Sequence, residues 1–152
     1  KTDITTFIKS KFLLFTLSST VLTIVVSLYG LISWKILLVQ FAAYFYSIGV
    51  ASVLVLYFAT RNYKYIDLSK GSSFNWQGVG AASMLMSLPV LLLPFAVYVP
   101  AAYYGNPYIA IGAVAGLGLA GIFTRNFWVA LLVKEFKKRK YKIAEGFRER
   151  AS

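Results

Sequence analysis

The sequence contains no cysteine and no histidine, and only five of its 152 residues are acidic. Without cysteine the chain forms no disulfide and offers no thiolate as a nucleophile or metal ligand. Without histidine it lacks the side chain that most often serves as a general base or binds a metal ion. No acidic residue falls inside a long apolar stretch, which disfavours an intramembrane enzyme and transport coupled to buried carboxylates. We therefore expect no catalytic residue, no metal site and no cofactor in this chain.

Long apolar stretches are what the sequence has in excess. Hydrophobic residues make up 59% of the chain, charged residues only 14%, and the mean hydropathy is +0.68. Polar side chains are too few to cover a water-soluble globule of this size. Each stretch can cross most or all of a hydrocarbon core of roughly 30 Å, at about 1.5 Å rise per helical residue. The sequence predicts an all-α polytopic transmembrane helical bundle with spans over residues 12–28, 36–60, 81–102 and 108–133.

Positive charges fall almost wholly on one side of these spans. Of the 16 Lys and Arg residues, only Lys35 lies in a loop on the other side. Because basic loops are retained in the cytoplasm, we expect a multi-pass membrane protein with both ends of this segment cytoplasmic. Two short external turns, over residues 29–35 and 103–107, arrange the four spans as two helical hairpins. The net charge of +11 follows from this topology, so nucleic acid is not an expected partner, whereas the lipid bilayer is.

We divide the chain into a transmembrane region over residues 1–133 and a basic cytoplasmic tail over residues 134–152. The apolar positions on one side of the tail, taken as a helix, are Val133, Phe136, Ile143, Ala144 and Phe147. The pattern favours either an amphipathic helix lying on an anionic inner leaflet or a solvated basic flank. Because the chain begins with Lys rather than Met, we also expect a longer parent protein whose missing N-terminal spans pack against this segment.

Hydroxyl and amide side chains recur along one face of each of the first two spans. Steps of three and four residues place them on the same side of a helix. Such a face either lines a polar substrate path or joins neighbouring spans by hydrogen bonds, which is the commoner role. The candidate path residues are Thr16, Thr20, Thr23 and Ser27, flanked by Ser19, in the first span, and Gln40 and Ser47, with Tyr44 and Ala51, in the second.

Three of the chain's four prolines, Pro89, Pro94 and Pro100, fall within the third span. Each removes a backbone donor and clashes with the preceding turn, so we expect this helix to be kinked or interrupted near the middle of the membrane. Broken helices line the binding sites of many transporters. Proline also serves simply to bend a helix around its neighbours, and the sequence leaves both interpretations open.

The fourth span is rich in glycine. Gly112 and Gly116 form a GxxxG pair that Ala120 extends, while Gly118 and Gly121 add further points of close approach. Small residues at this spacing allow two helix backbones to pack tightly. The partner is either a helix of this chain or a helix of another chain, such as a second copy.

Several segments together resemble a known family. They are IDLSKGSSFNWQGVG (66–80), LPVLLLPF (88–95) in the proline-rich span, and FKKRKYKIAEGFRER (136–150). The chain resembles, along nearly its whole length, the C-terminal part of an uncharacterised bacterial membrane-protein family, a domain of unknown function similar to type-2 ABC transporter permeases. The resemblance implies a permease subunit in the bacterial cytoplasmic membrane, served by a separate ATP-binding subunit.

ATP is expected only on that partner, because the chain has no G-x-x-x-x-G-K-[ST] phosphate-binding loop. By position, the loop between the second and third spans is the expected contact with the ATP-binding subunit. The alternative is a non-transporting integral membrane scaffold or assembly protein, for which tight packing and a basic tail suffice. The candidate contact residues are Asp67, Phe74, Asn75, Trp76 and Gln77.

Overall fold

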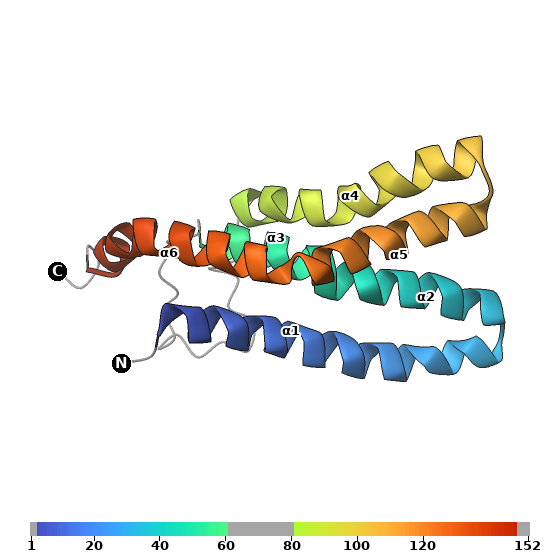
Figure 1. The fold of residues 1–152 in the computed structure, drawn as a ribbon, viewed down its shortest axis with the longest axis horizontal. Coiled ribbons are helices and arrows are strands. Elements are labelled where there is room, and N and C mark those ends of the chain that lie inside the picture. The colour runs from blue at the N-terminus through green and yellow to red at the C-terminus, as the bar shows by residue number, and fades with distance from the viewer. Residues whose placement is uncertain (1–2, 61–80, 149–152) are drawn as a thin grey trace.

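The fold is a bundle of helices that run back and forth along one long axis (Figure 1). The computed structural model describes residues 3–60 and 81–148, and every regular element in these ranges is helical, as expected for an all-α protein. The elements are α1 (Ile4–Val26), the 3-10 turn η1 (Ser27–Leu31), α2 (Trp34–Tyr46), the π-helical segment η2 (Ser47–Ala51), α3 (Ser52–Ala59), α4 (Ala81–Tyr104), α5 (Pro107–Phe123) and α6 (Arg125–Arg148).

Three helical stretches in the described part of the chain are long and apolar enough to cross a membrane. They run over Ile4–Leu31, Trp34–Ala59 and Ser87–Tyr104. A fourth crossing requires α5 and the first part of α6 to act as one span, although the two helices are bent by 63°. These long apolar helices are compatible with a membrane protein.

The expected span over residues 108–133 is divided at Thr124. The backbone of Thr124 leaves the helical region, with φ −86° and ψ 8°, and its hydroxyl donates to the carbonyl oxygen of Ala120 at 2.7 Å. Threonine hydroxyls that bond back to the preceding turn bend helices. α6 then continues from Arg125 past the expected tail boundary at residue 134 as a single helix.

Two tight turns join the helices into hairpins at the end of the bundle opposite both termini (Figure 1). η1 leads from α1 into α2, and Asn106 leads from α4 into α5. The Asn106 side chain accepts the backbone N–H of Tyr108 at 3.0 Å, while Pro107 occupies the first helical turn, where no donor is needed. The rings of Trp34 and Tyr108 stack across the two turns, with centroids 6.3 Å apart, which joins the hairpins at this end.

η2 interrupts the second span with a wider helical turn. The N–H of Ser52 bonds to the carbonyl of Ser47, five residues earlier, which leaves the carbonyl of Ile48 without its usual backbone donor. The Ser52 hydroxyl supplies the missing donor, at 2.8 Å, from a buried position. The π-helical segment is therefore internally satisfied even though it breaks the regular hydrogen-bond pattern.

α4 continues as one helix through Pro89, Pro94 and Pro100, and its axis changes direction along its length (Figure 1). Pro94 has no N–H to offer the carbonyl of Val90, four residues earlier. The hydroxyl of Tyr46, at the end of α2, donates to that carbonyl at 2.7 Å. The backbone donor that a proline removes in one span is thus replaced by a side chain from another span.

Two clusters of buried side chains hold the bundle together. One, at the end with the termini, joins α1, α3 and α6 around Phe12 and Leu132, each 1% exposed. The other joins α2 and α5 through Ala42, Tyr46 and Val114. Two residues of the expected tail face, Val133 and Phe136, pack against the first cluster, while the side chains of the remaining three lie outside the described residues.

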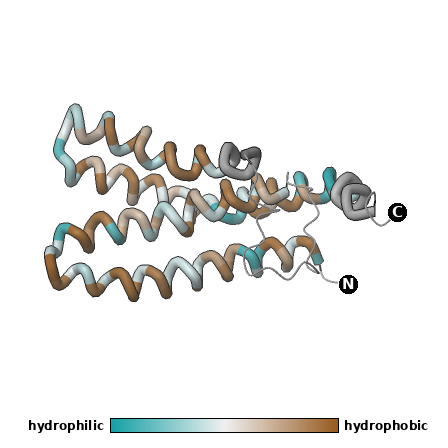
Figure 2. Tube along the Cα trace, turned by 180° about the vertical axis from the view of Figure 1, so that it is seen from behind, coloured by the Kyte–Doolittle hydropathy of each residue, from teal (hydrophilic) through white to brown (hydrophobic). Residues whose placement is uncertain are grey.

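The outward surface of the bundle is strongly apolar. Hydrophobic residues extend along the helices, and polar residues gather at the turns and near the termini (Figure 2). On α1, Leu17, Val21 and Leu22 are 55%, 59% and 64% exposed, and on α4, Leu91 and Phe95 are 59% and 62% exposed. A surface of this kind is unstable in water and suits a hydrocarbon environment.

Candidate functional site

A row of polar contacts joins α1 to α2 and η2 along the inside of the first hairpin. The two hydroxyls of Ser19 and Ser47 lie 2.9 Å apart, and those of Thr20 and Tyr44 lie 3.0 Å apart. The amide nitrogen of Gln40 donates to the backbone carbonyl of Thr23. We call this set the polar seam. It consists of Ser19, Thr20 and Thr23 from α1 and Gln40, Tyr44 and Ser47 from α2 and η2.

The direction of one bond in the seam follows from proton counting. Thr20 donates its single hydroxyl hydrogen to the carbonyl of Thr16 at 2.7 Å. Tyr44 is therefore the donor in the contact between the two hydroxyls. This arrangement directs the Tyr44 hydroxyl onto α1, so the two spans are held by directional bonds as well as by packing.

Two of the predicted path residues bond within their own helix instead. Thr16 donates to the carbonyl of Phe12 at 2.8 Å, and Ser27 donates to that of Ile24 at 2.6 Å. The structure thus brings the Thr20 hydroxyl and the backbone carbonyl of Thr23 into the seam and leaves Thr16 and Ser27 on its margins. Helical periodicity places all four on one face, but it does not say which of them meets the neighbouring span.

One polar atom of the seam, on the side chain of Gln40, has no hydrogen-bond partner among the described residues. This atom is the side-chain oxygen, which is buried, whereas the side-chain nitrogen is bonded to Thr23. An unpaired buried acceptor is unfavourable by about 1–3 kcal/mol, and more so away from water. It is also an acceptor available to a donor that enters the seam. The seam carries no charge and offers hydroxyl and amide groups only.

The glycines of α5 pack differently from the predicted pattern. An added Cβ at Gly112 or Gly116 would meet nothing within 4 Å, and Ala120 is exposed. Close contact is instead made by Gly118 and Gly121, the two further glycines, against the second span. The predicted contact through Gly112, Gly116 and Ala120 therefore has no partner among the described residues. Contact of this face with a helix of another chain, or of a part of this chain that is not described, stays a prediction.

Gly49 is the counterpart of the α5 glycines. A Cβ on Gly49 would overlap the carbonyl oxygen of Gly118, and one on Gly121 would lie 2.5 Å from the carbonyl oxygen of Gly49. Gly49 lies within η2, so the π-helical segment presents its backbone directly to α5. This contact was not predicted from the sequence. The only available signal was a glycine between two serines in an otherwise apolar span.

Arg125 follows the bend between α5 and α6 and lies over the ring of Phe12, with 4.8 Å between the guanidinium carbon and the ring centroid. Its charge is thus placed against an aromatic face. The predicted contact with an ATP-binding subunit, Asp67, Phe74, Asn75, Trp76 and Gln77, lies outside the described residues.

Comparison with known proteins identifies a family without a stated activity. A family described as "Family of unknown function (DUF5687)" matches residues 1–150. No curated protein and no solved structure matches the chain.

Proposed function

We propose that this chain, which belongs to the family of unknown function DUF5687, is the C-terminal portion of a membrane-spanning permease subunit of an ABC-type transporter. In this proposal it provides part of a translocation path in the bacterial cytoplasmic membrane, with both ends of the segment in the cytoplasm. The loop containing Asp67 to Gln77 contacts a separate ATP-binding subunit. The membership in a family of unknown function is established, while the likeness to type-2 permeases is part of the proposal.

The polar seam is the observation that carries this proposal. The seam places a row of polar groups between two apolar helices, and it ends on an unpaired acceptor, the side-chain oxygen of Gln40, which a path for a polar substrate would use. The seam also adjoins η2 through the contact between Ser19 and Ser47. π-helical turns occur frequently at functional sites. Rearrangement of η2 would separate the Ser19 and Ser47 hydroxyls and expose the seam to a polar substrate.

Cysteine accessibility tests whether the seam opens. In a transporter we expect Thr20→Cys and Thr23→Cys to react with a small charged thiol reagent in native membranes, with rates that change when ATP is added. Leu17→Cys and Val21→Cys, on the outward face of the same helix, are matched controls and should not react, because charged reagents do not enter hydrocarbon. The chain has no native cysteine, so there is no background reaction. Unreactive seam positions under every nucleotide condition would contradict a path here.

Affinity purification of the parent protein from native membranes tests the partner. We expect a stoichiometric ATPase with a phosphate-binding loop to accompany it in mild detergent. Phe74→Ala combined with Trp76→Ala should then uncouple ATP hydrolysis from transport while the protein still accumulates in the membrane. Stimulation of the ATPase by the double variant to the wild-type extent would show that these aromatic residues are not the contact.

A scaffold without transport is the second candidate, and a specific observation favours it. The seam is closed by direct hydrogen bonds, and the Gly49 contact with α5 leaves no space between the spans. Both features suit a bundle that holds one arrangement permanently. The cysteine experiment separates the two functions, because a permanently packed seam excludes the reagent whether or not ATP is present.

A further inference from the structure

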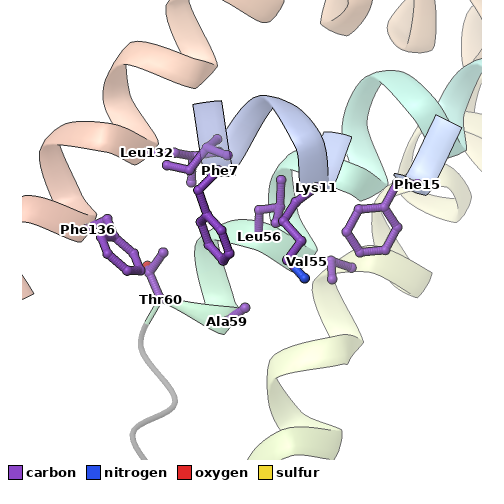
Figure 3. A pocket seen from close by; sticks show the side chains of 10 residues that line it. Phe7, Lys11, Phe15, Val55, Leu56, Ala59, Thr60, Leu132 and Phe136 are labelled. Atoms are coloured by element: carbon purple, nitrogen blue, oxygen red, sulfur yellow. The ribbon is translucent and has the colours of Figure 1, made fainter. Parts of the chain in front are cut away.

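A groove lies between α1, α3 and α6 at the end of the bundle that carries both termini (Figure 3). It has a volume of about 340 Å³, which is within the usual range of small-ligand sites. Its floor is formed by Ile8 and Leu132, which are 4% and 1% exposed. Its rim includes exposed residues, Phe7 and Ala59 among them, so the groove opens at the surface.

Lys11 is the one charged side chain among the described residues that line this groove. Its aliphatic stem lies along the wall near Val55 and Leu56, and its ammonium group lies 5.3 Å from the ring centroid of Phe7 (Figure 3). No ion pair joins Lys11 to either of the two carboxylates whose side chains the structure describes, those of Asp3 and Glu135. The groove therefore combines an apolar interior with a single positive charge that has no anionic partner there.

We propose that this groove binds one acyl chain of an anionic phospholipid, with the lipid phosphate paired to the ammonium group of Lys11. The apolar floor accommodates the hydrocarbon, and a lysine is an effective point charge for a phosphate. A free phosphate ion does not fit the same features, because one lysine without other donors holds an anion poorly and the apolar walls contribute nothing to it.

Charge complementarity favours an anionic lipid over a neutral one. Lys9 of α1 and Lys134, Lys137 and Lys138 of α6 are exposed, and each lies within two residues in the sequence of Ile8, Leu132 or Phe136, which line the groove. The opposite end carries only Lys35 among the described cations. These exposed lysines attract anionic lipids to this end of the bundle in the membrane. Direct pairing with Lys11 then selects the lipid whose acyl chain occupies the groove. This site requires a membrane environment but does not depend on transport.

Native mass spectrometry of the full chain in mild detergent tests the proposal. Phosphatidylglycerol and phosphatidylcholine with identical acyl chains are titrated separately. We expect phosphatidylglycerol to bind more tightly, and Lys11→Ala to weaken its binding about fivefold, the effect of one lysine at an anionic headgroup. Lys11→Arg should retain binding. Lys9→Ala, which removes an exposed lysine outside the groove lining, should change it by less than about twofold.

Ala59→Phe tests the apolar half of the site, because a large ring at the rim fills the groove without removing a charge. It should weaken the binding of both lipids, and a thermal unfolding scan of each variant verifies that the bundle is intact. Equal binding of the two lipids by the wild type, or equal effects of Lys11→Ala and Lys9→Ala, would overturn the proposal. Displacement of the lipid by glycerol phosphate alone would overturn the role assigned to the acyl chain.

Discussion

Gly49→Ala should destabilise the bundle by about 2 to 3 kcal/mol, the upper part of the range for overpacking a tight contact. The added methyl group would overlap the carbonyl oxygen of Gly118, which is backbone and not a flexible side chain. Relief therefore requires η2 and α5 to move apart, and that movement loosens the cluster around Ala42 and Val114. Equilibrium unfolding in mixed detergent micelles measures the loss.

Gly112→Ala and Gly116→Ala are the matched controls for Gly49→Ala. Both positions are in a helix and have open space where the methyl group would lie. They should stabilise α5 slightly, by up to about 1 kcal/mol, because alanine favours helix more than glycine does. A similar loss at Gly49, Gly112 and Gly116 would contradict the selective contact at Gly49. A loss of association without a loss of monomer stability at Gly112 or Gly116 would instead identify their face as a contact with a second copy.

Tyr46→Phe should destabilise the protein by about 1 to 2 kcal/mol, although it removes a single oxygen atom. The lost hydroxyl is the donor to the carbonyl of Val90, which Pro94 deprives of a backbone donor. The partly buried carbonyl of Val90 then has no donor in an apolar setting. Tyr98→Phe on α4 is the control, since that hydroxyl makes no hydrogen bond within the described residues and its removal should have little effect.

A double-mutant cycle with Pro94→Ala tests the cause of this effect. Alanine restores the N–H that can bond to the carbonyl of Val90, so Tyr46→Phe in the Pro94→Ala background should change stability by less than about 0.5 kcal/mol. The two substitutions would then be coupled across α2 and α4. If Tyr46→Phe has the same effect in both backgrounds, the tyrosine acts through packing in the cluster with Val114 and not through the carbonyl.

The helical architecture could be predicted from the sequence because each apolar stretch favours a helix independently of the rest of the chain. A long run without charges has to satisfy its backbone hydrogen bonds internally in hydrocarbon, and a helix does so whatever surrounds it. Local chemistry also marks the tight turns, as Asn106 and Pro107 illustrate by capping α5. The apolar helical stretch over Trp34–Ala59 begins and ends within two residues of the bounds expected for the second span. The exception is the bend at Thr124, because a single threonine among glycines is a weak signal.

Contacts between helices were determined by the tertiary structure. Periodicity grouped Thr16, Thr20, Thr23 and Ser27 on one face, but only the register of α2 against α1 decided that Ser19 and Thr20 meet Ser47 and Tyr44. The GxxxG spacing favoured Gly112 and Gly116, yet the rotation of α5 turns Gly118 and Gly121 toward Gly49.

The sequence by itself determined that this protein has long apolar helices, no acidic residue inside an apolar stretch, and basic residues gathered between and after these stretches. The tertiary structure decided which small and polar residues within those helices face one another, and it alone placed Lys11 beside an apolar groove. The physical reason is the separation along the sequence between the residues that interact. Backbone hydrogen bonding acts over four or five residues, whereas the contact of Tyr46 with Val90 joins positions in different spans.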